Sequence, residues 1–465
     1  MKRHVDLRRG SYRDSVRLMQ ISQALQAVPG VSAALVAMAT ELNLELAAGM
    51  GFAPPEAAGP NDMVVAVAAD DDSALAEALR HLDGELADVP TAPVSGFGAP
   101  PAPRTVGSAV RRSGADLVLV STPGRYAFLD AIDALEAGAS VMLFSDNVPV
   151  EQEVRLKEAA AERGLLMMGP DCGTAVIGGV GLGFANVVRP GPVGLVAASG
   201  TGAQQVMSLL DAADVGVSHC LGVGGRDLSS TVDGRGTLAA LDALDADAAT
   251  ELVVVVSKPS AAEVASRVRS HAARLSTPVV FALLGESAPD LTAAVEEVLR
   301  VLGRPAVKPW PRWLPAASPL ARAGTVHGLF AGGTLCDEAR LIAAGAGVAH
   351  TMVDFGDDRL TAGRPHPMID GSLRIEALAR EPAGVVLLDV VLGHAADPDP
   401  AAALAPALAA AGERGVLGVV SLIGTAGDPQ GMPRQAAALC EAGAAVFASN
   451  AEAARYAVGL ARSAA

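Results

Sequence analysis

The sequence contains few aromatic residues and less basic than acidic charge. Phe, Trp and Tyr make up 3% of the 465 residues, which disfavours a protein that stacks bases on aromatic rings. The 35 Lys and Arg residues against 51 Asp and Glu residues leave a net charge of -16, which disfavours nucleic acid and anionic membrane surfaces as partners. An anionic substrate must therefore be held by local features, because the overall field repels it.

Long apolar runs and closely spaced cysteines are also missing. No uninterrupted apolar run approaches the roughly 18 residues of a membrane span, and Met1–His4 leads into a polar stretch without the apolar core of a secretory signal. We therefore expect a cytoplasmic protein that does not bind membranes. The cysteines show no CxxC spacing, so neither a disulfide framework nor a metal site is expected. Four buried thiols are predicted instead, at Cys172, Cys220, Cys336 and Cys440.

The composition is that of a folded protein with several domains. Hydrophobic residues make up 51% and charged residues 18% of the chain, which excludes a disordered protein. Residues 1–103 are predicted to form a small βαβ-type module followed by a proline-rich linker from 91. From residue 104, apolar strands alternate with amphipathic helices, which is typical of parallel sheets covered on both faces. The predicted units are 104–190, 191–305 and 324–465, with a proline-rich linker at 306–323.

Two of these units carry the same turn between a strand and a helix. Val193–Ala198 runs into Ser199–Gly202, and Val326–Ala331 runs into Gly332–Leu335, each before a helix. Glycine at this point lets the free N–H groups of the first helical turn reach an anion such as phosphate. For a single copy, a threonine that simply caps the helix is the better interpretation. Two copies favour anion binding, at Ser199, Gly200, Thr201, Gly202, Gly332, Gly333, Thr334 and Leu335.

Other strand ends provide weaker candidates. Gly424–Gly427 is a weaker third case of a Gly-Thr turn between a strand and a helix. Arg226 follows a glycine-rich strand end and either clamps a carboxylate or phosphate or pairs with Asp227 on the surface. Cys172 is interpreted as a small buried residue rather than a nucleophile. The candidate substrate contacts are Asp171, Gly224, Gly225 and His394.

The densest polar stretch lies between Asp354 and Asp370. Prolines on both sides of His366 restrict the backbone and favour its presentation, with Arg364, to a ligand. A proline-rich loop at a domain contact is the alternative. Arg226, Arg364 and His366 are the candidate catalytic residues, with Arg226 or Arg364 binding a carboxylate and His366 donating a proton.

Several of these strings resemble the α subunit of succinyl-CoA synthetase. Gly169–Cys172, Ala198–Thr201 and Gly222–Gly225 occur in its order and spacing. The last domain, with its Gly-Gly-Thr turn, is similar to the C-terminal domain of the β subunit. An α-like part fused to a β-like tail, with the strings Thr325–Cys336 and Gly363–Asp370, resembles the FdrA family over essentially the whole chain.

This resemblance implies an α/β fold class with a definite order of domains. It places a small N-terminal α+β module first, then a Rossmann-like unit of the CoA-binding type at 104–190. Two flavodoxin-like domains of the succinyl-CoA synthetase type follow, at 191–305 and 324–465.

The resemblance also has clear departures. The synthetases carry a phosphorylated histidine, but the comparable segment Val279–Glu286 contains none. The glutamate that supports that histidine is replaced within Ser257–Ser260. The CoA phosphate loop and an ATP-grasp domain are absent as well. We therefore expect no required cofactor, with phosphate or carbamoyl phosphate as a substrate.

Members of the FdrA family are associated with oxamate carbamoyltransferase. The resemblance therefore implies a complex subunit that interconverts oxalurate plus phosphate with oxamate plus carbamoyl phosphate, in purine or allantoin catabolism. Its partners would be companion subunits and a small anionic substrate, with homo-oligomerisation open. The alternatives are an acyl-CoA synthetase that uses CoA and nucleotide sites of a partner chain, and a non-catalytic scaffold subunit.

Overall fold

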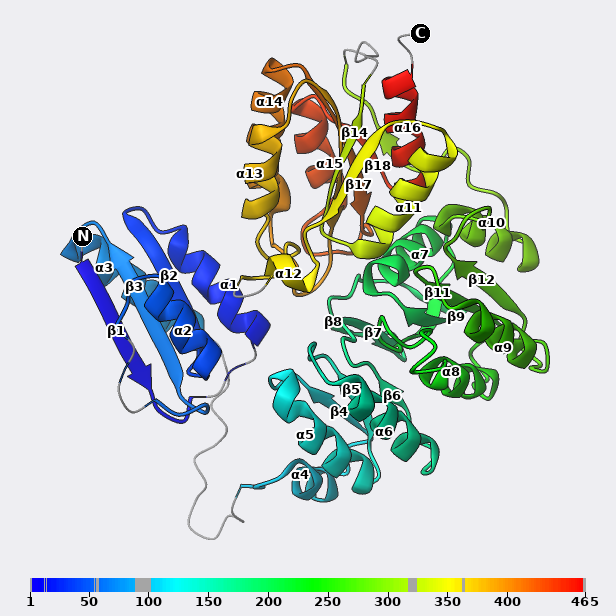
Figure 1. Ribbon diagram of the computed structural model, residues 1–465, viewed down its shortest axis with the longest axis horizontal. Helices are drawn as coiled ribbons and strands as arrows, with labels where there is room; N and C mark the ends of the chain where they lie inside the picture. The colour runs from blue at the N-terminus through cyan, green and yellow to red at the C-terminus, as the bar shows by residue number, and fades with distance from the viewer. Residues whose placement is uncertain are drawn as a thin grey trace. The chain divides into compact units, whose positions relative to one another are not determined.

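A computed structural model describes residues 2–462, with gaps at 12, 14, 54, 56–57, 88–101, 317–323 and 362–363. The chain forms two compact units (Figure 1). The first contains Met1–Ala102 and Asp358–Asp370, and the second contains Pro103–Asp357 and Gly371–Ala465. Residues 358–370, which the sequence placed in the C-terminal domain, thus group with the first unit. Most of the linker predicted at 91–103, and part of that at 306–323, lies outside the described residues.

The first unit is built on a three-stranded antiparallel sheet with the order β1-β3-β2. Helices α1 and α3 pack on one face through Leu18, Ile21 and Leu82, while α2 covers part of the other face through Ala47. The βαβ-type arrangement expected from the sequence is wrong, because β2 and β3 pair antiparallel. The elements are β1 (Lys2–Arg8), α1 (Ser15–Gln26), β2 (Val31–Met38), α2 (Glu41–Gly49), β3 (Met63–Ala69), α3 (Asp72–Ala87) and α12 (Asp358–Thr361).

The second unit begins with a three-stranded parallel sheet in the order β4-β5-β6. Its core is alanine-rich: Ala127, Ala131 and Ala134 of α5 pack with Leu156 of α6. The elements are α4 (Val106–Ser113), β4 (Leu117–Val120), α5 (Gly124–Glu136), β5 (Ser140–Leu143), α6 (Val150–Ala161) and β6 (Met167–Met168).

Two six-stranded sheets complete the second unit. The first contains β7 (Thr174–Ile177), β8 (Val180–Gly183), β9 (Pro190–Ala198), β10 (Val217–Gly222), β11 (Leu252–Ser257) and β12 (Val279–Leu283), with α7 (Gly200–Ala212), α8 (Arg235–Asp245), α9 (Ala262–Ala272) and α10 (Leu291–Val301). The second contains β13 (Arg312–Trp313), β14 (Val326–Phe330), β15 (His350–Asp354), β16 (Gly384–Val391), β17 (Val416–Ile423) and β18 (Ala445–Phe447), with α11 (Gly333–Gly345), α13 (Ser372–Arg380), α14 (Pro400–Glu413), α15 (Met432–Glu441) and α16 (Asn450–Arg462).

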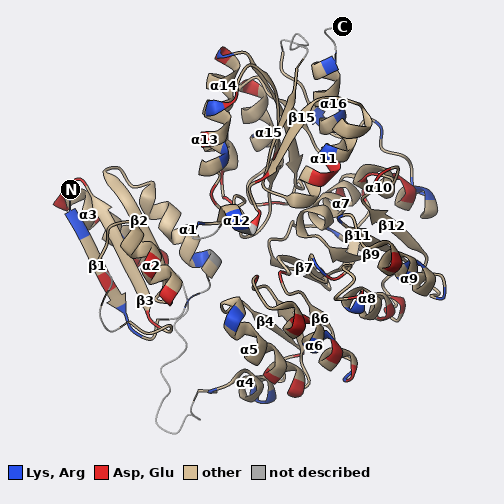
Figure 2. Ribbon diagram, viewed as in Figure 1, with Lys and Arg blue, Asp and Glu red and all other residues tan. Residues whose placement is uncertain are grey.

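Four strands of each sheet follow the same order, β12-β11-β9-β10 in the first and β17-β16-β14-β15 in the second. The full orders are β12-β11-β9-β10-β7-β8 and β13-β18-β17-β16-β14-β15. In each sheet the leading strand, β9 or β14, lies between the next two strands of its repeat, and these pairs are parallel. The predicted α/β fold with two alike flavodoxin-like units is therefore confirmed. Figure 2 shows the charged residues mainly on the surrounding helices, with β9, β11 and β12 uncharged.

Helices α7 and α10 of the first six-stranded sheet pack against α11 and α16 of the second. The amide of Gln205 spans this contact: its nitrogen donates to the Ala448 carbonyl at 3.0 Å and its oxygen accepts from Asn450 N–H at 2.8 Å. The Glu338 carboxylate accepts from Leu291 N–H and from the Asn450 amide, both at 2.7 Å. Buried polar groups thus fix the two sheets relative to each other. Among the described residues, no helix is long and apolar enough to cross a membrane.

Candidate active site

Helices α7 and α11 begin directly at the ends of the buried strands β9 and β14. Ser199 is the N-cap of α7, and its hydroxyl accepts a hydrogen bond from Gly202 N–H at 2.9 Å. Gly332 has no side chain for this task at α11. The Asp389 carboxylate instead holds the turn before the helix, where it accepts from Ala331 and Gly332 N–H at 2.7 and 2.9 Å. The Gly-Thr pairs lie inside the first helical turn, whereas the sequence placed them in the preceding loop.

The two helix N-termini face each other. Ser199 Oγ lies 2.5 Å from Thr334 Oγ1. A Cβ atom on Gly332 would lie 2.6 Å from Thr201 Oγ1, and one on Gly202 would lie 3.0 Å from Thr334 Cγ2. The glycines are therefore required for the close approach of the two helices.

Part of this contact opens to solvent. Of the eight candidate phosphate-binding residues, Gly200 is exposed and Thr201 and Gly333 are partly exposed, while the others are buried. The first N–H groups of a helix lack carbonyl partners within it, and they carry the positive end of its dipole. Solvent therefore reaches the N-termini of both helices at these three residues, and we call this exposed part of the contact the opening.

Lys258 and Asp354 lie beside Gly333 in the same opening, and neither is among the site residues predicted from the sequence. Lys258 follows the last residue of β11, and Asp354 is the last residue of β15. A Cβ atom on Gly333 would lie 2.5 Å from Asp354 Oδ2 and 2.6 Å from Lys258 Nζ. Burial raises the pKa of the Asp354 carboxyl to about 6, although the Gly356 N–H bond and the Lys258 charge lower it. The signal available in the sequence was that both residues stand at the carboxyl ends of parallel strands.

A buried ion pair supports the turn behind α11. Arg374 Nη1 donates to Asp389 Oδ1 at 2.9 Å and to the Asp389 carbonyl at 2.6 Å. Burial raises the pKa of the Asp389 carboxyl, and the charge of Arg374 opposes that shift. Arg374 and the N–H groups of Ala331 and Gly332 therefore hold the Asp389 carboxyl in place beside the α11 N-terminus.

Asp171 and the glycines after β10 lie together at another part of this sheet edge. The Gly169 N–H donates to the Gly222 carbonyl at 3.0 Å. A Cβ atom on Gly224, whose φ is 90°, would lie 2.4 Å from the Pro170 carbonyl oxygen, and one on Gly225 would lie 3.8 Å from Asp171 Oδ2. Three candidate substrate contacts, Asp171, Gly224 and Gly225, are therefore neighbours.

Cys172 beside them is buried, as the sequence predicted. Burial raises the pKa of its thiol to about 12, so the thiol stays protonated near neutral pH. This environment fits a structural residue and not a nucleophile.

Arg226 belongs to an ionic network between α6 and the loop after β10. Its guanidinium binds the Glu153 carboxylate at 2.9 Å and the Val148 carbonyl at 2.8 Å. The alternative pairing with Asp227 is wrong, because Asp227 is fully buried and binds Lys157 at 2.7 Å. Arg226 therefore already has a carboxylate partner within the chain.

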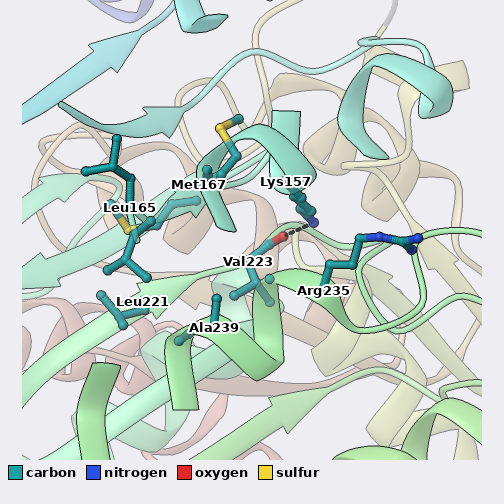
Figure 3. Close-up of a pocket in the computed structure, with 12 residues that line it drawn as sticks. Lys157, Leu165, Met167, Leu221, Val223, Arg235 and Ala239 are labelled. Carbon is teal, nitrogen blue, oxygen red and sulfur yellow. Dashed lines mark hydrogen bonds between the residues drawn. The ribbon is translucent and has the colours of Figure 1, made fainter. Parts of the chain in front are cut away.

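The cavity beside Lys157 is small. Figure 3 shows Lys157 donating to the Val223 carbonyl, with Arg235, Leu221 and Met167 around it. The volume of this cavity is about 10 Å³, which leaves room for a single water molecule. This space is a packing gap and not a substrate pocket.

His394 and Thr425 follow strands β16 and β17. His394 is exposed, and its backbone N–H donates to the Ala185 carbonyl at 2.8 Å.

Thr425 was predicted to stand at a third helix mouth, but α15 begins at Met432. The Thr425 hydroxyl instead donates to the Val187 carbonyl at 2.6 Å. The third Gly-Thr turn is thus a structural contact.

Arg364 and His366 belong to the first unit, next to α12. Arg364 N–H donates to the Thr361 carbonyl at 2.9 Å, and His366 accepts at Nδ1 from Met368 N–H at 3.2 Å. Gly363 of the same string lies outside the described residues. The paired helix N-termini belong to the second unit, so the structure does not group these two residues with them.

The whole chain is similar to a protein of Escherichia coli (strain K12). It is 36% identical to "Uncharacterized protein YahF", and the alignment covers 95% of each chain. This chain belongs to the YahF family. Residues 329–460 of this YahF-family chain also match the family described as CoA-ligase.

Part of the chain is similar to α subunits of succinate–CoA ligase [ADP-forming]. Identity is 26% to that of Methanothermobacter thermautotrophicus and 28% to the subunit alpha 2 of Archaeoglobus fulgidus. These alignments cover 37% and 40% of this chain, and the chain spans 58% and 64% of those subunits. The dinucleotide forming acetyl-coenzyme A synthetase 1 of Ca. Korarchaeum cryptofilum, solved with phosphate and ADP, is 17% identical over 81% of this chain and 88% of that one. The TM-score of this match is 0.32.

Residues 1–98 match the family described as "AllF, heavy metal-associated domain". The residues present do not fit a metal. All four cysteines lie beyond this segment, so it has no thiolate for a soft metal ion. Within the part of the chain that the structure describes, no group of three His, Cys, Asp or Glu residues could hold an ion.

Proposed function

We propose that this chain is a subunit of an enzyme that transfers a carbamoyl or acyl group between a small anionic substrate and phosphate. The phosphate is held at the paired N-termini of α7 and α11. The observation that supports this most is the contact of Ser199 Oγ with Thr334 Oγ1 at 2.5 Å, which sets two positive helix ends together. In a chain of net charge -16, such a site binds an anion without a cluster of basic side chains.

The resemblance to the FdrA family supports a specific reaction. Together with companion subunits, the chain would convert oxalurate and hydrogen phosphate into oxamate and carbamoyl phosphate. A phosphate oxygen attacks the carbamoyl carbon, the carbon–nitrogen bond breaks, and the leaving nitrogen gains the proton that hydrogen phosphate loses. The N–H groups of Gly200, Thr201 and Gly333 orient the phosphate for this attack.

The roles that the sequence assigned to three side chains are not part of this proposal. Arg226 already binds Glu153. Arg364 and His366 lie in the first unit, outside the unit that contains the paired helices.

A second candidate is an acyl-CoA synthetase whose CoA and nucleotide sites come from a partner chain. The CoA-ligase match over residues 329–460 and the succinate–CoA ligase relatives support it. The missing histidine in Val279–Glu286 counts against a phosphohistidine relay in this chain. Lys258 counts against it as well, because it stands in the segment where the synthetases carry the supporting glutamate.

One set of assays separates the candidates. The purified chain, with and without its companion subunits, is incubated with carbamoyl phosphate and oxamate, and phosphate and oxalurate are measured. Parallel tubes contain ATP, CoA and succinate. Equal amounts of phosphate and oxalurate support the transferase, whereas ADP and acyl-CoA formation support the ligase. No turnover in either set supports a scaffold role and overturns the proposal.

A further inference from the structure

The opening at the paired helices contains one cation and one carboxylate that can meet a substrate. Lys258 Nζ and Asp354 Oδ2 lie 2.6 and 2.5 Å from the place of a Cβ atom on Gly333, the first residue of α11. Only glycine leaves room for both groups at this helix end. Both side chains are partly exposed, so they border the opening itself.

A second observation points to a ligand near the start of α7. Gln204 of α7 is 1% exposed, and among the described residues neither its amide nitrogen nor its amide oxygen has a hydrogen-bond partner. Gln204 lies one helical turn beyond Gly200, and side chains on a helix lean towards its N-terminus. A buried amide without partners is rare in folded proteins and calls for a water or a ligand. Gln204 shares the helix face of Gly200, whose Cβ position lies 3.3 Å from Thr174 Oγ1 of β7, so that ligand would lie on the β7 side of the α7 N-terminus.

We propose that Asp354 is the proton donor to the leaving nitrogen and that Lys258 binds the carboxylate of the same substrate. This inference rests on the proposed function and deepens it. The substrate class is a small carboxylate with an amide or ureido nitrogen as the leaving group. The helix N-termini then bind the phosphate, and Lys258 binds the carboxylate of the substrate, so that each anion has a positive partner.

The proton balance of the step is complete. The Asp354 carboxyl gives its proton to the nitrogen as the carbon–nitrogen bond breaks, and the resulting carboxylate takes up the proton that hydrogen phosphate loses on attack. In the reverse direction, the Asp354 carboxylate removes a proton from the attacking amide. No oxidant, metal or nucleotide is needed.

The surroundings of Asp354 hold it protonated nearer to neutral pH than an ordinary aspartate. Burial raises its pKa to about 6, against the lowering effects of Gly356 N–H and Lys258, and the charges of Asp389 and Asp357 raise it further. The Cys336 thiol of α11 also faces it, and burial raises the pKa of that thiol to about 12, so it stays uncharged. A bound phosphate adds another negative charge and raises the Asp354 pKa more.

The test compares Asp354→Asn with the wild-type chain in complex with its companion subunits, in both reaction directions. For the wild type, kcat/KM falls with rising pH in the phosphorolysis of oxalurate and rises with pH in its synthesis. Asp354→Asn keeps the bond from Gly356 N–H to Oδ1, so it should fold. We expect it to lose about 10²- to 10⁴-fold in kcat together with this pH limb. Activity within threefold of the wild type, with the same pH limb, overturns the role of Asp354.

Asp357→Asn is the matched control, since it removes a carboxylate three residues further along. It should keep the wild-type kcat and move the pH limb slightly lower, because one negative neighbour of Asp354 is gone. A loss as large as that of Asp354→Asn would mean that the general charge of the loop matters and not the proton donor.

The role of Lys258 is tested by comparing the KM values for the two substrates. Lys258→Gln should raise the KM for oxamate at least tenfold and leave the KM for carbamoyl phosphate within threefold, and Lys258→Arg should restore much of the loss. Equal changes for both substrates would overturn its role as the carboxylate partner. If the wild type shows no phosphate-dependent turnover at all, the proposed function fails instead, and this is seen before any variant is made.

Discussion

Ser199 Oγ lies 2.5 Å from Thr334 Oγ1, although 135 residues separate them in the chain. Each residue belongs to the first turn or the cap of a helix that follows the leading strand of a flavodoxin-like sheet. Ser199 also accepts from Gly202 N–H, so it serves its own helix and the opposite one at once. This contact joins the stability of the two sheets to the geometry of the candidate active site.

The two hydroxyls should be energetically coupled. Ser199→Ala removes the α7 cap, which costs about 1 kcal/mol, and leaves the buried Thr334 hydroxyl without this partner. Thr334→Val removes the other side of the same contact. We expect the double variant to lose less stability than the sum of the single losses, by at least about 0.5 kcal/mol in urea unfolding. Strictly additive losses would show that the contact does not contribute.

Gly332 should not tolerate a side chain. A Cβ atom there would lie 2.6 to 2.8 Å from three atoms of the Thr201 side chain, which is short and cannot swing away. Gly332→Ala is expected to lower the free energy of unfolding by about 1–3 kcal/mol. Gly345→Ala at the other end of α11 is the control, since nothing lies within 4 Å of its Cβ position. That change should be neutral or stabilising, because alanine is the better helix former.

Lys157 should be essential to the stability of the second unit. Its ammonium binds Glu153 at 2.8 Å and Asp227 at 2.7 Å, and all three side chains are buried. Lys157→Met fills a similar volume but leaves buried carboxylates uncompensated, so we expect a loss of about 3–5 kcal/mol in urea unfolding. Arg163→Gln, at a partly exposed ion pair with Glu162, should change stability by less than about 1 kcal/mol. Comparable effects of the two changes would contradict this account of the network.

Glu338 should make stability depend on pH in an unusual direction. Burial raises the pKa of its carboxyl to about 7, above the unfolded value near 4.5, and Asp290 adds to the shift. Between pH 4.5 and 7 the folded state therefore keeps a proton that the unfolded state loses. This group alone makes the protein more stable as the pH falls from about 7 towards 4.5, by on the order of 1–3 kcal/mol.

The comparison of wild type with Glu338→Gln isolates this contribution, since other carboxyls titrate equally in both. The stability difference between the two proteins should change across pH 5 to 7.5, with the wild type gaining relative to the variant at low pH. A difference that is constant with pH would show that the Glu338 pKa is not raised.

The sequence contained enough information for the sheets but not for every site residue. The apolar strand Val193–Ala198 and its Gly-Thr turn recur at 326–334, so two alike sheets were predictable. Lys258 and Asp354 were accessible to the same reasoning, because each stands at a strand's carboxyl end, but neither belongs to a glycine-rich motif. The partner of Arg226 was beyond reach, since Glu153 lies 73 residues away and its burial depends on the tertiary structure.

The remaining errors have local causes. Thr425 was assigned to a helix mouth because the Gly-Thr pattern does not show that the helix starts seven residues later, at Met432. The strand Lys2–Arg8 was not recognised, since four of its seven residues are Lys, Arg or Asp and only Val5 and Leu7 mark an apolar face.

The most direct test of the central claim is a calorimetric titration of inorganic phosphate into the wild-type chain, Gly333→Ala and Gly345→Ala. A methyl group on Gly333 would lie against Asp354 Oδ2 and Lys258 Nζ, so these side chains must leave their positions beside the α11 N-terminus. We predict saturable phosphate binding for the wild type and for Gly345→Ala, and binding at least tenfold weaker for Gly333→Ala. Equal phosphate affinity in all three proteins, or no binding by the wild type, would contradict a phosphate site at the paired helix N-termini.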